Sequence, residues 1–239
     1  MASNPPRVVP SSEFEFDALG EAHNYRRALI QEFGAFLKGR VIDAGAGIGQ
    51  VTELLQRQAG VCEVLAVEPE LTFCQAIEQH LPGVKVFHGT VANLPPTTSC
   101  NVLVCINVLE HIQDDAGALR EFNRILAKER GVLCLFVPAG PEIFTPLDRK
   151  YGHYRRYSKS ELKRKLEVAG FELLRLDYYN FPGYLAWWLL FRVFRLRRLR
   201  AGGVKLFDRY LFPVIHWFER RIARPPCGQS LIGVARPKP

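Results

Sequence analysis

A short apolar run in this chain ends in an acidic residue and is followed by glycine at every second position. The acid is Asp43, and the glycines are Gly45, Gly47 and Gly49. This pattern predicts a β-strand that turns sharply at its carboxyl end, where the backbone is open to a nucleotide-like ligand. The dinucleotide-binding fingerprint would need its third glycine at position 50, where this chain has Gln50. A nucleotide-dependent oxidoreductase is therefore disfavoured, and a glycine turn in some other α/β fold is the alternative.

A second acid follows at the spacing that a bound nucleoside would need. The β-rich run 61–67 ends at Glu68-Pro69, and Glu68 lies nineteen residues after Gly49. In a βαβ unit this spacing puts the Glu68 carboxylate at the tip of the second strand, beside the glycine turn. Its two oxygens could accept hydrogen bonds from both ribose hydroxyls. No arginine follows Glu68 to accommodate a 2′-phosphate.

Strand-like and helix-like segments alternate along most of the chain, which predicts a doubly wound, mostly parallel sheet. The run 101–107 is almost continuously apolar, as in a central parallel strand that is covered on both faces. The last two strands should pair as an antiparallel hairpin at the sheet edge, with a helical insertion over 180–227 between them. The other expected strands lie at 41–43, 61–67, within 84–95, and at 132–138, 171–179 and 228–236.

The glycine turn resembles motif I of class I S-adenosylmethionine (SAM)-dependent methyltransferases, and the likeness extends over most of the chain. The segment Val108-Leu109-Glu110-His111-Ile112 is similar to the post-motif-II signature of the ubiquinone- and menaquinone-type small-molecule methyltransferases. Asp148 followed by Gly152-His153-Tyr154-Arg155-Arg156-Tyr157 resembles a branch of the same superfamily with this segment after its fifth strand. The resemblance implies a Rossmann-like α/β fold, an enzyme that transfers methyl groups, and SAM as cofactor.

The resemblance also implies a set of contacts to the cofactor. Thr90 stands where many relatives carry an acid, so the backbone or Asn93 would contact the adenine amine. A helical cover over 14–38 would bring Tyr25 or Arg26 to the methionine carboxylate. The predicted cofactor-binding residues are Tyr25, Asp43, Gly45, Gly47, Gly49, Glu68, Pro69, Thr90, Val91, Asn107 and Val108.

His111 and His153 are the predicted catalytic residues, because an imidazole titrates near neutral pH and can act as a general base. His111 would begin the helix after the fourth strand, and the alternative is that it only shapes the cofactor pocket. His153 lies among tyrosines that could stack on a substrate and arginines that could grip a carboxylate or phosphate. The alternative there is a solvated basic loop. The predicted substrate-binding residues are Tyr154, Arg155, Arg156, Tyr157, Trp187 and Trp188.

Length and composition favour one catalytic domain over the whole chain, 1–239. The chain is 48% hydrophobic, enough for a full core without disulfides or metals. Its six cysteines show no CxxC pairing and fit a reducing, cytoplasmic compartment. The six histidines are scattered along the sequence, so no metal site is predicted. The proline-rich start, residues 1–13, lacks a signal-peptide core and is expected to be a disordered lead-in.

Charge is divided unevenly between the two parts of the chain. Residues 1–144 have a net charge of −6, and residues 145–239 have a net charge of +14. The basic part contains a Trp/Phe/Leu-rich segment, 181–194, that runs into the arginine-rich stretch 195–200. This segment is too short and too quickly charged to span a bilayer. We interpret it as a mobile lid, with peripheral membrane contact or a homodimer face as alternatives.

The acceptor is predicted to be a small or lipid-like molecule, most simply methylated at oxygen, because the insertion is rich in aromatic and aliphatic residues. A nucleobase enzyme would want Asn/Asp-Pro-Pro-Tyr/Phe after the fourth strand, where this chain has Asn107-Val108-Leu109-Glu110. Nucleic acid is therefore not the expected partner, although the basic part keeps an RNA substrate as an alternative. A catalytically inactive protein with this fold is the other alternative.

Overall fold

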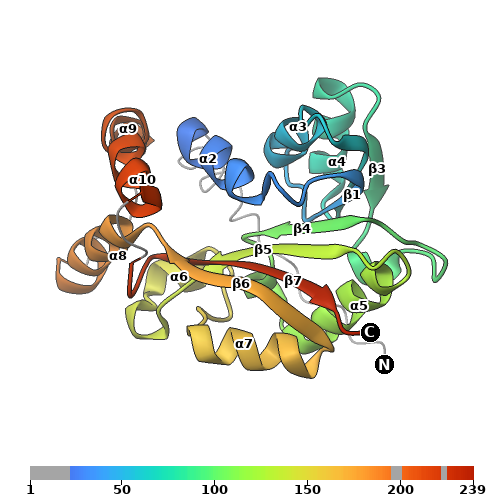
Figure 1. Ribbon diagram of the computed structural model, residues 1–239. Helices are drawn as coiled ribbons and strands as arrows, with labels where there is room; N and C mark the ends of the chain where they lie inside the picture. The colour runs from blue at the N-terminus through green and yellow to red at the C-terminus, as the bar shows by residue number, and fades with distance from the viewer. Residues whose placement is uncertain (1–21, 195–200, 222–224) are drawn as a thin grey trace, which may run out of the picture.

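One seven-stranded sheet lies at the centre of the computed structural model (Figure 1), which describes residues 22–194, 201–221 and 225–239. Its strands are β1 (Gly39–Ala44), β2 (Val61–Glu68), β3 (Lys85–His88), β4 (Val102–Ile106), β5 (Val132–Pro138), β6 (Phe171–Tyr179) and β7 (Ser230–Pro237). They are ordered β3-β2-β1-β4-β5-β7-β6. The first five pair in parallel, and β7 lies antiparallel between β5 and β6. The predicted Rossmann-like sheet with an antiparallel final strand is confirmed.

Helices cover both faces of the sheet because alternate residues of its buried central strands point to opposite sides. One face carries α5 (Asp115–Ala127) and α7 (Lys159–Val168), and the other carries α2 (His23–Phe33) and α3 (Gln50–Gln56). In β4, Leu103 and Cys105 belong to the first buried cluster, and Val102 and Val104 belong to the second. The nearly continuous apolar run at 101–107 is therefore explained by burial on both sides.

The helix after β4 begins later than predicted. His111 ends the short turn η2 (Leu109–His111), and α5 starts only at Asp115. The Asp114 side chain accepts a hydrogen bond from Gly117 N at 2.9 Å, which satisfies one of the free amides at the start of α5. His111 is therefore placed on a turn and not at a helix start. The remaining short elements before β6 are α4 (Leu71–His80), η1 (Val91–Asn93), η3 (Pro141–Ile143) and α6 (Pro146–Lys150).

The insertion between β6 and β7 is mostly helical where it is described, and residues 225–229 before β7 are not. It contains α8 (Phe181–Trp187) and the π-helical turn η4 (Trp188–Val193), then α9 (Ala201–Leu206), η5 (Phe207–Leu211) and α10 (Phe212–Arg221). The predicted lead-in 1–13 and the arginine-rich stretch 195–200 lie outside the described residues. Within the described part of the chain, no helix combines the length and the apolar character that crossing a membrane requires.

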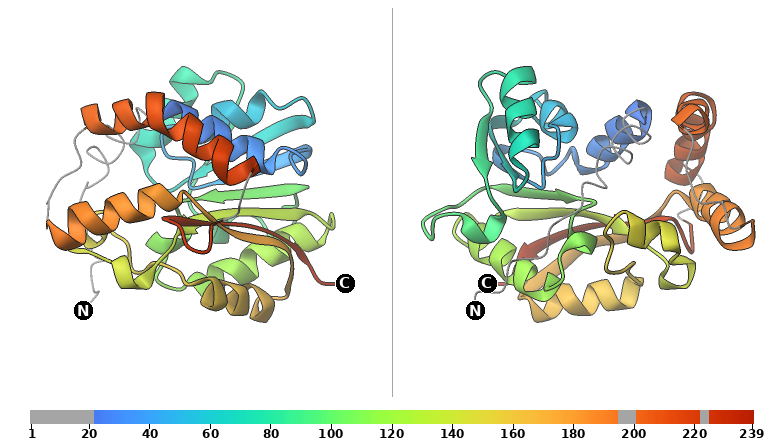
Figure 2. Two further views of the ribbon diagram at one scale, coloured as in Figure 1. Left: turned by 60° about the vertical axis from the view of Figure 1, so that its left-hand side comes forward. Right: turned by 180° about the vertical axis from the view of Figure 1, so that it is seen from behind.

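The N-terminal helix α2 packs against this insertion, as Figure 2 shows for α2 and α10. The Asp208 carboxylate accepts hydrogen bonds from Asn24 N at 2.9 Å and from Tyr25 N at 2.8 Å. A carboxylate at the first turn of a helix satisfies its free amides and stabilises the helix dipole. Asp208 therefore caps α2 from a distant part of the chain. In α10, the Glu219 carboxylate accepts hydrogen bonds from the backbone amides of Asn180 and Phe181, at the start of α8.

Candidate functional site

The turn after β1 folds its backbone against β2. Gly45 N and Ala46 N both donate hydrogen bonds to Val67 O, at 2.8 and 3.1 Å. Gly45 has a φ of +75°, which side-chain-bearing residues rarely adopt, and a Cβ atom there would overlap the Val108 side chain. The turn that the sequence predicted is therefore present, and it lies in contact with the loop after β4.

Two backbone amides hold the Glu68 carboxylate at the tip of β2. Oε2 accepts a hydrogen bond from Gly47 N at 2.8 Å, and Oε1 accepts one from Glu70 N at 2.9 Å. Burial raises the pKa of this carboxyl group. Each carboxylate oxygen can accept more than one hydrogen bond, so both oxygens retain capacity for a ligand. The Glu68 carboxylate thus lies beside the backbone of the glycine turn and keeps acceptor capacity on both oxygens.

Asp43 lies beneath the turn and is buried. Its Oδ2 accepts a hydrogen bond from Thr52 Oγ1 at 2.7 Å, which ties β1 to α3. Burial, and to a smaller degree the nearby Glu68 charge, raises the pKa of Asp43 to about 7. Asp43 is therefore placed to hold the turn in shape from below.

The other predicted cofactor residues lie at the carboxyl ends of neighbouring strands. Thr90 pairs with Asn93, whose Oδ1 accepts hydrogen bonds from Thr90 N and Oγ1 at 2.9 and 2.7 Å; Val91 is the first residue of that turn. Asn107 is exposed after β4 with a φ of +53°, a conformation that asparagine tolerates better than most residues. Pro69 is exposed after β2. The glycine turn, a carboxylate with spare acceptor capacity and these strand ends have the chemistry that a nucleoside such as that of SAM would need.

Tyr25 packs away from the role predicted for it. Its ring contacts Phe136 and Tyr179 edge-on, with centroids 6.1 and 5.6 Å apart. Burial raises the pKa of its hydroxyl, which also forms hydrogen bonds with the Ser230 and Asn180 side chains. These partners belong to the ends of β5, β6 and β7. Tyr25 therefore anchors α2 to the sheet, and this packing gives no support for a contact with the methionine carboxylate.

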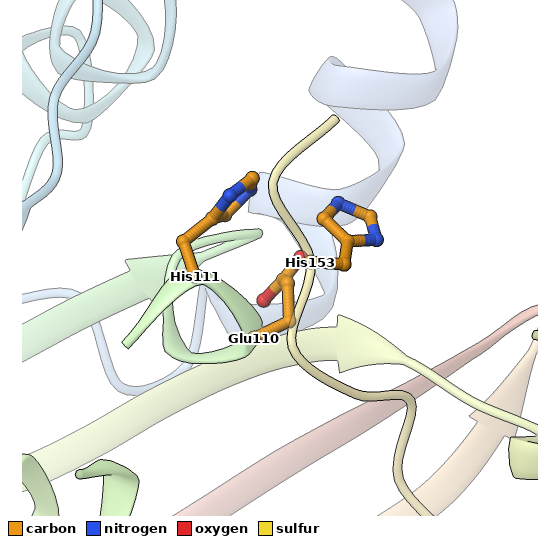
Figure 3. A group of neighbouring side chains, drawn as sticks. All are labelled: Glu110, His111 and His153. Carbon is orange, nitrogen blue, oxygen red and sulfur yellow. The ribbon is translucent and has the colours of Figure 1, made fainter. Parts of the chain in front are cut away.

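The two predicted catalytic histidines lie next to each other. The ring centroids of His111 and His153 are 4.7 Å apart, and Glu110 joins them in a cluster whose candidate ligand atoms all lie within 4.8 Å of one another (Figure 3). The Asp148 carboxylate lies 3.2 Å from His153 Nδ1. Burial, with the neighbouring His153 as a second cause, lowers the pKa of His111 to about 4. His111 is therefore neutral at pH 7.

This cluster corrects the expectation that the histidines are scattered. The backbone amide of Tyr154 donates to Glu110 O at 2.9 Å, which joins the loop after α6 to the turn after β4. His153 N donates to Asp148 O at 3.0 Å in the same loop. Residues far apart in sequence are thereby brought to the same end of the sheet. Glu110 and Asp148 were not among the predicted site residues, although both stand inside the motifs that carry the family resemblance.

Three of the predicted substrate-binding residues are engaged inside the protein. Arg156 is 4% exposed, and its Nε lies 2.7 Å from Asp148 Oδ1. Tyr157 is fully buried and donates its hydroxyl to Asp115 Oδ2 at 2.9 Å. Arg155 forms an ion pair with the same Asp115 carboxylate at 2.9 Å. Full burial leaves no ring face of Tyr157 for a substrate to stack on, and Arg156 instead orients Asp148 behind His153. Arg155, Arg156 and Tyr157 are therefore not part of the substrate site that we propose below.

The adjacent tryptophans of the insertion have different surroundings. Trp187 is buried against Phe191, and the Arg156 guanidinium lies over its ring, 4.5 Å from the centroid. Within the described structure, Trp187 Nε1 is buried without a hydrogen-bond partner. Trp188 is 46% exposed, and Tyr154 is also exposed. Trp187 thus links the insertion to the loop that carries His153, while Trp188 faces outward.

Comparison with known proteins agrees with this fold. The family described as "Methyltransferase domain" matches residues 20–176, and the chain therefore belongs to this methyltransferase family. It is 32% identical over 138 residues to a Mycolicibacterium smegmatis protein named "Probable S-adenosylmethionine-dependent methyltransferase", over 56% of this chain and 52% of that protein. The chain spans about half the length of the curated relatives it matches. The predicted class is confirmed at the level of the family.

Solved structures share the fold at low sequence identity. The Haloferax volcanii methyltransferase in complex with its activator Trm112 has a TM-score of 0.65, with 14% identity and full coverage of both chains. The magnesium protoporphyrin IX methyltransferase of Synechocystis PCC 6803, with bound S-adenosylhomocysteine (SAH), has a TM-score of 0.58 and 14% identity, covering 100% of this chain and 90% of that one. These likenesses show a Rossmann-like methyltransferase fold.

Proposed function

We propose that this chain is a SAM-dependent methyltransferase that methylates an oxygen of a small or lipid-like acceptor. The observation that carries the proposal is the pairing of a nucleoside-compatible edge with a histidine cluster on the same side of the sheet. Gly45, Gly47 and Glu68 form the first part, and His111 and His153 lie in the second. Val108 contacts the glycine turn and stands two residues before Glu110, so the two parts adjoin.

When bound, SAM supplies a methyl group that its sulfonium already activates. The chain's own part is to bind and orient the nucleoside, to exclude water and to hold the acceptor in line, and such positioning can supply much of the acceleration. His153 Nδ1 lies against Asp148, so the tautomer that donates to this carboxylate leaves Nε2 to accept a proton from an acceptor hydroxyl. Asp148 is in turn fixed by buried Arg156.

Two observations support an acceptor that has both an apolar body and a polar oxygen. Trp187 Nε1 is a buried donor with no partner among the described residues, and an unsatisfied donor costs about 1–3 kcal/mol, which a bound acceptor would relieve. The same ring packs with Ile143, Leu147 and Tyr151 in a small apolar cluster beside the His153 loop. An acceptor that combines an apolar body with an oxygen would match both.

The direct test uses the whole chain with methyl-labelled SAM and a fractionated cell extract. We expect label in a small-molecule or lipid fraction, and none above background when the Glu68→Gln protein is used. Alkali treatment of the labelled product separates methyl esters, which it releases, from ethers and N-methyl groups. Label that appears only in RNA would overturn the proposed acceptor class.

We further propose that the insertion docks on an anionic lipid surface. The insertion has many exposed large apolar side chains, which together we call the apolar arm: Leu185, Trp188, Leu189, Leu190, Val193, Phe194, Leu206, Tyr210, Leu211, Val214, Trp217 and Phe218. Exposed cationic residues, Arg192, Lys205, Arg209 and Arg221, accompany the apolar arm. Apolar residues flanked by cations suit the interface of a membrane with anionic headgroups.

Replacing both exposed tryptophans of the arm, Trp188→Ser with Trp217→Ser, should weaken binding to vesicles of mixed neutral and anionic lipid by roughly tenfold or more. The reason is the apolar area withdrawn from water, at ~25 cal/mol per Å². Binding of the parent protein should fall as salt is raised, because surface charges are screened. Vesicle sedimentation measures both effects, and Val168→Ser, an exposed apolar residue of α7, is the control. A parent protein that never sediments with vesicles but elutes as a dimer would assign the arm to a second copy.

A further inference from the structure

The histidine cluster has the composition and geometry of a metal centre. Glu110, His111 and His153 each offer one ligand atom, and these atoms all lie within 4.8 Å of one another. Figure 3 shows the Glu110 carboxylate between the two imidazole rings. We propose that these three residues bind one divalent cation on the acceptor side of the cofactor crevice.

The chain holds the three residues in place without help from a ligand. His111 N donates to Val108 O at 2.9 Å and closes the turn that carries Glu110 and His111. The bond from Tyr154 N to Glu110 O fixes the His153 loop against that turn. Glu110 is 1% exposed, so its carboxylate is confined to this small space. A set of ligands fixed in advance loses little freedom when a cation binds.

The surroundings of both rings are those expected around metal-bound histidines. Such histidines almost always donate their second ring nitrogen to a carboxylate or a backbone carbonyl. His153 Nδ1 lies 3.2 Å from the Asp148 carboxylate, and the His111 ring forms a hydrogen bond with the backbone of Gly152. Each ring is therefore oriented by one protein group.

The ligand types indicate which cations fit. Two imidazoles and one carboxylate suit transition-type cations such as Zn²⁺, Mn²⁺, Fe²⁺ or Co²⁺, whereas Ca²⁺ and Mg²⁺ prefer oxygen ligands. Three protein ligands leave open positions on the cation. The cluster adjoins the glycine turn through Val108, so an acceptor oxygen is the natural further ligand.

This inference rests on the proposed function and narrows its acceptor to molecules with a hydroxyl or carboxylate that can bind a cation. A hydroxyl bound to a divalent cation ionises more readily, because the positive charge stabilises the oxyanion. Its proton would leave to a water molecule held in another of the cation's open positions. In this arrangement His153 acts as a ligand, and the cation takes over the role of holding the oxygen in its reactive form.

The test is a titration of the EDTA-dialysed whole chain with Zn²⁺ by calorimetry and with Co²⁺ by visible absorbance. We expect one saturable site per chain and a Co²⁺ spectrum typical of nitrogen and oxygen ligands. Glu110→Gln, which keeps the size of the buried side chain, and His153→Ala should each weaken binding at least ~100-fold. His80→Ala, at an exposed position on α4, should leave it unchanged.

Binding that is absent, or that persists at the parent affinity in folded Glu110→Gln and His153→Ala proteins, would overturn the proposed site. Circular dichroism and thermal melting of each variant separate lost ligands from lost folding, and a variant that unfolds is replaced by His111→Ala. SAH is titrated in parallel into the same metal-free protein. A protein that binds the cation but not SAH refutes the proposed function alone, and one that binds SAH but not the cation refutes the metal site alone.

Discussion

We expect Glu68→Gln to weaken SAH binding by at least ~100-fold. The carboxylate already accepts Gly47 N and Glu70 N, one on each oxygen, and it would accept the ribose hydroxyls with its remaining lone pairs. Glutamine replaces one oxygen with an NH2 group, which cannot accept a hydrogen bond from either amide. Toward the ribose, the NH2 group cannot accept from one hydroxyl, and the remaining oxygen meets the other without a charge. Hydrogen bonds to a charged group contribute about 1.5–3 kcal/mol each, so loss of these two charge-assisted bonds corresponds to roughly 10²–10⁴-fold in affinity.

The matched control is Glu70→Gln, the same substitution two residues further on. The Glu70 side chain is exposed, and the hydrogen bond from its backbone amide to Glu68 is kept in this variant. Calorimetry with SAH should therefore give the parent affinity for this control. Equal affinities for the parent and a folded Glu68→Gln protein would refute the role of this carboxylate in ribose binding.

Asp43→Asn should stabilise the ligand-free protein at pH 8 and have little effect near pH 4. The pKa of Asp43 rises from 3.8 to about 7 on folding, so the folded state favours the protonated form. The stability that this proton contributes is complete below pH 3.8 and is lost as the pH rises to about 7. At about 1.4 kcal/mol per pKa unit, the loss is at most on the order of 4 kcal/mol. Asparagine stays neutral, and its amide oxygen can still accept from Thr52.

Denaturant unfolding of both proteins at pH 5 and pH 8 measures this difference. Groups far from Asp43 titrate equally in the two proteins, so the difference between them reports on Asp43 and its neighbour Glu68. We expect the advantage of Asp43→Asn to grow with pH over this range. A constant difference at both pH values would show that Asp43 is already ionised in the folded protein at pH 5, and would contradict the raised pKa.

The sheet could be predicted from the sequence because its signals are local. The strand expected at 171–179 coincides with β6, and the run at 132–138 coincides with β5. Each of these strands is a run of residues that favour β-structure, and turn residues bound it. The glycine turn and Glu68 were also found, because a βαβ unit fixes the spacing between them.

The surroundings of the second motif could not be predicted, because they depend on partners far away in the sequence. Arg156 and Tyr157 have the chemistry of substrate-binding residues, but buried Asp148 and Asp115 pair with them in the folded chain. The sequence shows that an arginine and a tyrosine are present. It does not show which carboxylate each of them contacts in the folded chain. The same holds for Tyr25, whose helix is capped by distant Asp208.

The cluster of Glu110, His111 and His153 is a contact that the sequence did not reveal. Its members were in view as parts of two motifs, but only the fold of the loop after α6 brings His153 to His111. Sequence spacing therefore suggested scattered histidines where the structure has neighbours.

The most direct test of the central claim is titration calorimetry of the whole chain with SAM, SAH and NAD under identical conditions. The account predicts one site per chain for SAM and for SAH, no binding of NAD, and loss of both sulfur nucleosides in Glu68→Gln but not in Glu70→Gln. Binding of NAD without either sulfur nucleoside would contradict it.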